Sequence, residues 1–149
     1  MASPEADTVL VPVDGSDESE RAAEYAVALA AEYDAALHAM YVLGEAAARA
    51  IDAGALDPED AAAEGRAVLG SIGDSAAAEG LPFAHSTAYG FSTSRKTVHP
   101  GSVILDAADQ LAADLLVIPR ESAREGSADV LEKAAEYVLL YASQPVLSV

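Results

Sequence analysis

Short apolar runs alternate along the chain with longer segments whose apolar residues recur every three or four positions. The runs are Thr8–Val13, Ala36–Leu43, Leu81–Tyr89, Leu115–Ile118 and Pro145–Val149. Uncharged runs of this length are typical of strands that are covered on both faces of a sheet. The pattern therefore predicts five strands separated by helices.

The first helical segment is predicted to begin at Ser19, because a serine between Glu18 and Glu20 suits the positive end of a helix. It is expected to end near Tyr33. Its apolar positions form a narrow stripe of small side chains that suits close packing on a sheet. The stripe consists of Ala22, Ala23, Ala26, Leu29 and Ala30.

The remaining segments predict three more long helices. A loop or short helix is expected after residue 45, then a helix from about Pro58, since proline is favourable in a first turn. Ser102 is expected to cap the next helix, and the last is predicted from Val130 to about Ala142. Alternating strands and helices predict an α/β fold, doubly wound, with an open parallel sheet covered on both faces.

Length and composition exclude several classes of protein. The 149 residues fit one domain, 1–149, and contain no cysteine, which excludes disulfides, thiolate catalysis and cysteine-ligated zinc. Residues 1–7 are acidic and lack an apolar run, so neither a secretory signal nor a membrane span is expected there. We expect a cytoplasmic protein with no membrane partner.

The chain is strongly acidic, with 25 Asp and Glu against eight Lys and Arg and a net charge of −17. Such a charge disfavours nucleic-acid binding. An acid excess with only two lysines is typical of a halophilic source, where molar salt shortens electrostatic screening to about 3 Å. An ordinary acidic protein is the alternative. Five of the eight cations lie in residues 91–149.

In open parallel sheets, ligands bind beyond the carboxyl ends of the strands. The segments there are Asp14–Ser16 after the first predicted strand, Phe91–His99 after the third and Arg120–Asp129 after the fourth.

The two ends of the chain resemble universal stress proteins, most sharply in Val13-Asp14-Gly15-Ser16, Asp114–Ile118 and Pro145–Leu147. Further similarity at Pro100, Ile104 and Ala135–Leu139 extends the resemblance over nearly the whole chain. It implies a five-stranded Rossmann-like sheet of the adenine nucleotide alpha hydrolase type, in the order 3-2-1-4-5. It also implies a homodimer through the strand Pro145–Val149, whose apolar edge must be covered.

Nucleotide-binding members carry Gly-x-x-Gly, nine residues, then Gly-Ser or Gly-Thr after the fourth strand, where bare backbone N–H groups face the phosphates. This spacing falls on Pro119, Ser122, Glu132 and Lys133. Proline has no N–H, serine adds a Cβ, and a carboxylate ~4 Å from a phosphate costs ~4 kcal/mol at an effective dielectric of about 20. We therefore expect no ATP or AMP cofactor.

Asp14 and Val42 occupy positions that resemble the adenine or ribose contacts of nucleotide-binding relatives. An aspartate after the first strand equally suits a turn cap, and Val42 equally suits strand filling, so both interpretations stay open.

Five cations follow the third and fourth predicted strands, at the carboxyl ends of the strands, and we call this region the basic edge. The hydroxyl of Ser122 is close to three of these cations in the sequence. Arginine and hydroxyl groups suit phosphate or sulfate, so the edge is a candidate site for a small anion or an acidic partner. The alternative is that these cations pair with local acids such as Glu121, Glu125 and Glu132. The cations are Arg95, Lys96, Arg120, Arg124 and Lys133.

Other classes fit less well. A phosphoacceptor receiver domain needs an aspartate where Tyr89 ends the third strand and a lysine where Gln144 precedes Pro145. An ATP-pyrophosphatase loop needs two adjacent glycines after the first strand, and Asp14–Ser19 has one.

No serine lies in Gly-x-Ser-x-Gly, and no spacing suits a metal. His38 and His85 fall within strands, where packing is the common role, and His99 has no carboxylate partner in the sequence. We expect a non-catalytic stress-response or regulatory protein that does not bind ATP tightly, with a nucleotide or small-anion sensor as the alternative.

Overall fold

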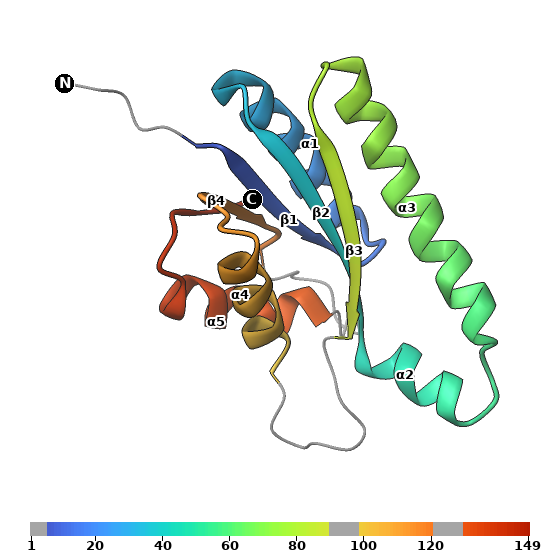
Figure 1. Ribbon diagram of the computed structural model, residues 1–149. Coiled ribbons are helices and arrows are strands. Elements are labelled where there is room, and N and C mark those ends of the chain that lie inside the picture. The colour runs from blue at the N-terminus through green and yellow to red at the C-terminus, as the bar shows by residue number, and fades with distance from the viewer. Residues whose placement is uncertain (1–5, 90–98, 121–129) are drawn as a thin grey trace.

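The computed structural model describes residues 6–89, 99–120 and 130–149, and five parallel strands form its single sheet (Figure 1). The strand order is β3-β2-β1-β4-β5, so the predicted fold class and order are confirmed. The strands are β1 (Thr8–Val13), β2 (Ala36–Leu43), β3 (Phe83–Tyr89), β4 (Leu115–Ile118) and β5 (Val146–Ser148).

Helices cover both faces of the sheet. α1 and α3 pack on one face, whereas α4 and α5 pack on the other, and the short α2 follows β2 (Figure 1). Along the described parts of the chain, no helix is long and apolar enough to cross a membrane. The helices are α1 (Asp17–Tyr33), α2 (Glu45–Asp52), α3 (Pro58–Ala78), α4 (Pro100–Gln110) and α5 (Val130–Tyr141).

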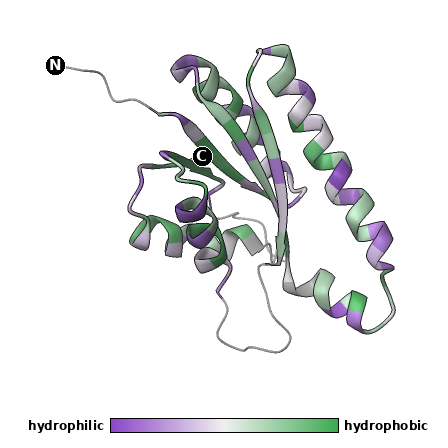
Figure 2. Ribbon diagram, viewed as in Figure 1, coloured by the Kyte–Doolittle hydropathy of each residue, from purple (hydrophilic) through white to green (hydrophobic). Residues whose placement is uncertain are grey.

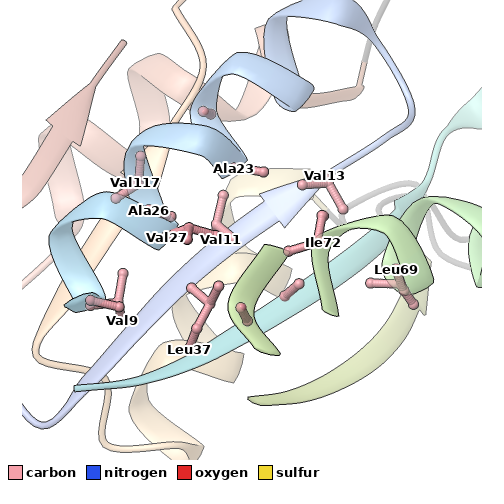
Figure 3. Packing of buried hydrophobic residues seen from close by; sticks show 14 of the residues in the cluster. Val9, Val11, Val13, Ala23, Ala26, Val27, Leu37, Leu69, Ile72 and Val117 are labelled. Atoms are coloured by element: carbon pink, nitrogen blue, oxygen red, sulfur yellow. The ribbon is translucent and has the colours of Figure 1, made fainter. Parts of the chain in front are cut away.

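The central strand β1 divides the core into two layers. Val9, Val11 and Val13 point toward α1 and α3, where they meet small residues such as Ala26 (Figure 3). Leu10 points to the opposite layer, formed with α4 and α5. Because both faces of β1 are covered, its apolar run is continuous instead of alternating. Figure 2 shows hydrophobic colouring along much of the central strands and mixed colouring along α3.

The start of α1 differs from the prediction. The cap is Ser16, whose Oγ accepts the N–H of Ser19 at 3.1 Å, so the helix begins at Asp17. Ser19 is buried and its hydroxyl donates to the Ser16 carbonyl at 3.0 Å. The buried stripe also includes Val27, whereas Leu29 is only partly buried.

The start of α4 differs as well. His99 caps this helix, with its Nδ1 accepting the N–H of Gly101 at 3.0 Å, and Ser102 lies inside the first turn. Pro100 explains the earlier start, because proline at the first helical position has no N–H to satisfy and a backbone angle suited to a helix.

Candidate functional site

Asp14 organises the turn between β1 and α1. Its Oδ1 accepts the backbone N–H of Ser16 at 3.0 Å and the Ser16 hydroxyl at 2.5 Å. The Asp14 N–H in turn donates to Ser19 Oγ at 3.3 Å. Gly15 sits between them with a φ of 84°, which favours glycine. This geometry favours the turn-capping interpretation of Asp14.

Val42 lies beside this turn, because β1 and β2 pair in parallel with Val13 opposite Tyr41. Its side chain is 1% exposed and belongs to the core layer that contains Ile104 and Leu131. The geometry favours the strand-filling interpretation of Val42.

The backbone at the end of β4 is already bonded. Pro119 is buried and has no N–H to donate. The N–H of Arg120 donates to the carbonyl of Val149 at 2.8 Å, and the Val149 N–H donates to the Ile118 carbonyl at 3.0 Å. The first two positions after β4 therefore present no free backbone donor to a ligand.

The rest of the candidate basic edge lies largely outside the described residues. This applies to Ser122, Arg124 and the segment with Arg95 and Lys96. Lys133 belongs to α5, but its side chain is outside the description, as is that of Glu132. The structure thus places Asp14 in the turn after β1, Val42 on the adjacent strand β2 and an exposed Arg120 after β4. The gathering of cations stays a prediction.

The three histidines differ in their burial and in the residues that they contact. His38 is half-buried, and its Nε2 lies 2.8 Å from Ser86 Oγ on β3. Burial lowers the pKa of His38, and the neighbouring His85 lowers it further. His85 is exposed because β3 is an edge strand, and its ring centroid lies 6.0 Å from that of Phe83. The His99 ring stacks on Tyr137 with centroids 4.4 Å apart.

No metal centre accompanies these residues. Across residues 6–89, 99–120 and 130–149, no group of three or more His, Asp or Glu side chains is placed to hold a metal ion.

Tyr41 is a residue that the sequence pattern did not single out. Burial raises the pKa of its hydroxyl, and the carboxylates of Glu64 and Asp14 raise it further. A Cβ added at Gly15 would lie 3.8 Å from Glu64 Oε1 and 3.9 Å from the Tyr41 hydroxyl. The signal that could have pointed to Tyr41 is Gly65, whose missing side chain allows α3 to approach the ring.

Comparison with protein families identifies one match. The sequence model of the universal stress protein family matches residues 5–149, which is nearly the whole chain. Comparison with curated proteins finds no match.

Several solved structures share the fold. A universal stress protein crystallised with cAMP is 24% identical, with a TM-score of 0.67, and the alignment covers 98% of each chain. The universal stress protein UspA from Lactobacillus plantarum is 23% identical, with a TM-score of 0.68 and 99% of each chain covered. A universal stress protein from Archaeoglobus fulgidus in complex with dAMP is 24% identical, with a TM-score of 0.62 and 95% of each chain covered.

Proposed function

Because this chain belongs to the universal stress protein family, we propose that it is a non-catalytic regulatory module of the stress response that does not bind ATP tightly. The observation that carries the proposal is the identity of the four residues at the spacing of the family's nucleotide motif. They are Pro119, Ser122, Glu132 and Lys133. Three glycines are replaced, one of them by a carboxylate.

The bonding at the end of β4 supports this proposal. A phosphate-binding loop works by turning free N–H groups toward the phosphate oxygens. Here Pro119 has no N–H, and the N–H of Arg120 is bonded to Val149. A phosphate would have to break that bond or find its donors further along the chain.

The surroundings of Asp14 and Val42 also support the proposal that ATP is not bound tightly. Two of the similar structures were crystallised with cAMP and with dAMP, so nucleotide binding is a real alternative for this fold. In this chain Asp14 is engaged by Ser16, and Val42 is 1% exposed. A base would have to uncover Val42 before it could contact that side chain.

Calorimetric titration with ATP and with AMP tests the proposal directly. The titrations are run in concentrated KCl, after circular dichroism has been used to check that the chain is folded in that buffer. We expect no binding tighter than about 1 mM, which corresponds to about 4 kcal/mol of binding free energy. Micromolar affinity for either nucleotide would overturn the proposal.

We further propose that the protein is a homodimer assembled through β5. Within the described chain, β5 pairs only with β4, so its other edge is free to pair with a second copy. Leu147 on β5 is 36% exposed, and Leu139, Leu140 and Tyr141 of α5 are exposed as well. An apolar surface of this kind beside a free edge suits a two-fold interface.

A halophilic, cytoplasmic setting is part of the same proposal. A net charge of −17 makes the compact state repel itself unless salt screens it. Raising KCl from about 0.1 M to about 2 M should therefore stabilise the fold by roughly 2 kcal/mol, which is about 4–8 °C in melting temperature for a chain of this size. A melting temperature that is flat over this range would contradict the halophilic assignment.

The second candidate function is a small-anion sensor at the basic edge. It is favoured by the charge distribution, since residues 91–149 hold five of the eight cations, among them Arg120 and Arg124. Sulfate or phosphate at constant ionic strength should then raise the melting temperature, and Arg124→Ala should remove the rise. Arg21→Ala on α1 is the control, and a rise that survives Arg124→Ala would exclude this site.

A further inference from the structure

A cavity of about 220 Å³ lies between α3 and the carboxyl halves of β2 and β3, with α2 closing one end. Its floor includes Tyr41, which belongs to the core layer on the α1 and α3 face. Val42 points to the other layer. The cavity therefore lies on the face of the sheet opposite to the side chain of Val42. Figure 1 shows α2 and the start of α3 beyond the carboxyl ends of these strands.

Small residues on α3 create the space. Ala61, Ala62 and Gly65 line the cavity on this helix. A Cβ on Gly65 would lie 3.0 Å from Tyr41 Cδ1 and 3.2 Å from Cε1, so α3 rests closely on one part of the ring. Next to this contact, the side chains of Ala61 and Ala62 are too short to fill the space between α3 and the sheet. Leu43 and Ile51 complete a largely apolar wall.

The lining of this largely apolar cavity includes one positively charged side chain, that of Arg66. Its Nη2 lies 3.2 Å from Glu59 Oε1. These two side chains are 63% and 79% exposed, and ion pairs of such exposure contribute little to stability. A ligand carboxylate can replace Glu59, because the planar guanidinium accepts a carboxylate through two parallel hydrogen bonds.

The volume selects the size of the ligand. An apolar protein cavity of about 150 Å³ holds benzene, which has six heavy atoms, so ~220 Å³ holds roughly nine. A flat ring can pack against the Tyr41 ring with the geometry that aromatic pairs prefer. Thr87 adds a hydroxyl to the lining, suited to an oxygen of the ligand.

We propose that this cavity binds a small aromatic carboxylate, with the ring against Tyr41 and the carboxylate on Arg66. Benzoate, with nine heavy atoms, is the simplest molecule that has both features. The lining differs from the nucleotide motif, since none of its residues lies in the segments that follow β1 or β4.

Calorimetric titration with sodium benzoate tests the proposal, with sodium acetate keeping the ionic strength constant and serving as the anion without a ring. We expect benzoate to bind and acetate not to bind. Arg66→Gln should weaken benzoate binding about tenfold, because a hydrogen bond to a charged group is lost. Arg21→Gln on α1 should leave binding unchanged. Benzyl alcohol, a neutral molecule of similar shape, should bind about tenfold more weakly than benzoate.

A second pair of variants tests the location of the site. Ala62 lines the cavity and is exposed, so Ala62→Leu should fold and fill the space, and benzoate binding should be lost. Ala63 is the neighbouring exposed residue and is not part of the lining, so Ala63→Leu should bind benzoate as the unmodified chain does. The proposal fails if the unmodified chain does not bind benzoate or if Ala62→Leu binds it equally well. It also fails if benzyl alcohol matches benzoate.

Discussion

At the residue scale, one compact set of hydrogen bonds explains why a polar sequence follows the buried strand β1. Asp14 accepts two bonds from Ser16, and Ser16 accepts the N–H of Ser19. Every one of these bonds satisfies a donor that the turn or the first helical turn would otherwise leave open. These local hydrogen bonds give Asp14, Ser16 and Ser19 a structural role in the turn.

His38 gives a prediction about pH at this scale. Its pKa in the folded chain lies below the ordinary value of 6.5, chiefly through burial. The unfolded chain therefore takes up this proton first, and the stability that neutral His38 contributes is lost as the pH falls from 6.5 through the lower, folded pKa. The free energy of unfolding, measured with denaturant from about pH 7.5 to about pH 5, should fall less steeply for His38→Gln than for the unmodified chain.

The control for this prediction is His85→Gln. It removes only the second cause of the lowered pKa, so it should reduce the pH dependence partly and less than His38→Gln does. If His38→Gln leaves the slope unchanged below pH 6.5, burial of His38 is not linked to stability.

The sequence predicted that polar residues cap α1 and α4, but it did not predict which residue acts as each cap. The sequence predicts that α1 begins at Ser19, but the helix begins at Asp17 because the Ser16 hydroxyl accepts the N–H of Ser19, three residues further on. Ser102 was the expected cap of α4, but Pro100 sets the first turn and His99 becomes the cap. The proline rule that correctly placed the start of α3 at Pro58 applies equally to Pro100.

At the element scale, the packing of α4 against α5 depends on a glycine. A Cβ on Gly101 would lie 2.5 Å from Tyr137 Cδ1 and 2.7 Å from Tyr137 Cβ. The second atom is fixed to the α5 backbone, so rotating the ring cannot relieve the contact. The same tyrosine also stacks on His99, so it contacts the first turn of α4 at two residues.

Gly101→Ala should therefore destabilise the protein by about 1–3 kcal/mol, because the two helices must move apart. Gly70→Ala on α3 is the matched control, since a Cβ there meets no atom within 4 Å. That change should stabilise the fold by about 0.5–1 kcal/mol through helix propensity. Chemical denaturation of both variants measures the difference, and equal stabilities would show that α4 and α5 adjust freely.

The arrangement of elements was predictable because the central strands β1 and β4 are short apolar runs, whereas apolar residues recur every three or four positions in helices such as α1. All five strands and the four long helices lie where these patterns indicated. The cavity beside Tyr41 was not predictable, because it arises from side chains of β2, β3, α2 and α3 that only the folded chain brings together. For the candidate nucleotide or anion site, the sequence predicted which residues follow the strands. It did not predict the conformation of those loops, because loop conformation depends on tertiary contacts.

At the scale of the whole molecule, charge and the free sheet edge act together. Two copies with a net charge of −17 each repel one another, and salt removes that penalty, so association should strengthen with KCl. Among the described residues, β5 has one edge without a paired strand, and Leu147 is exposed on β5. If the proposed dimer forms through this edge, its assembly should depend on salt.

Light scattering after size-exclusion chromatography tests this assembly. In about 2 M KCl, where the Debye length is under about 3 Å, we expect twice the mass of one chain. Leu147→Asp should give the mass of one chain, because a charge replaces an apolar side chain at the proposed interface. Ala84→Asp, at an exposed position on β3 at the opposite edge, should remain a dimer. A monomeric unmodified chain would exclude the β5 dimer.

The chain belongs to the universal stress protein family, and we propose that four residues of its own stand where nucleotide-binding members carry their motif. The most direct test is a paired calorimetric titration with ATP of the unmodified chain and of the variant Pro119→Gly, Ser122→Gly, Glu132→Gly and Lys133→Ser. We predict no measurable binding for the unmodified chain. The variant should gain affinity, up to about a thousandfold from removal of the Glu132 charge alone. Micromolar ATP binding by the unmodified chain would contradict the account.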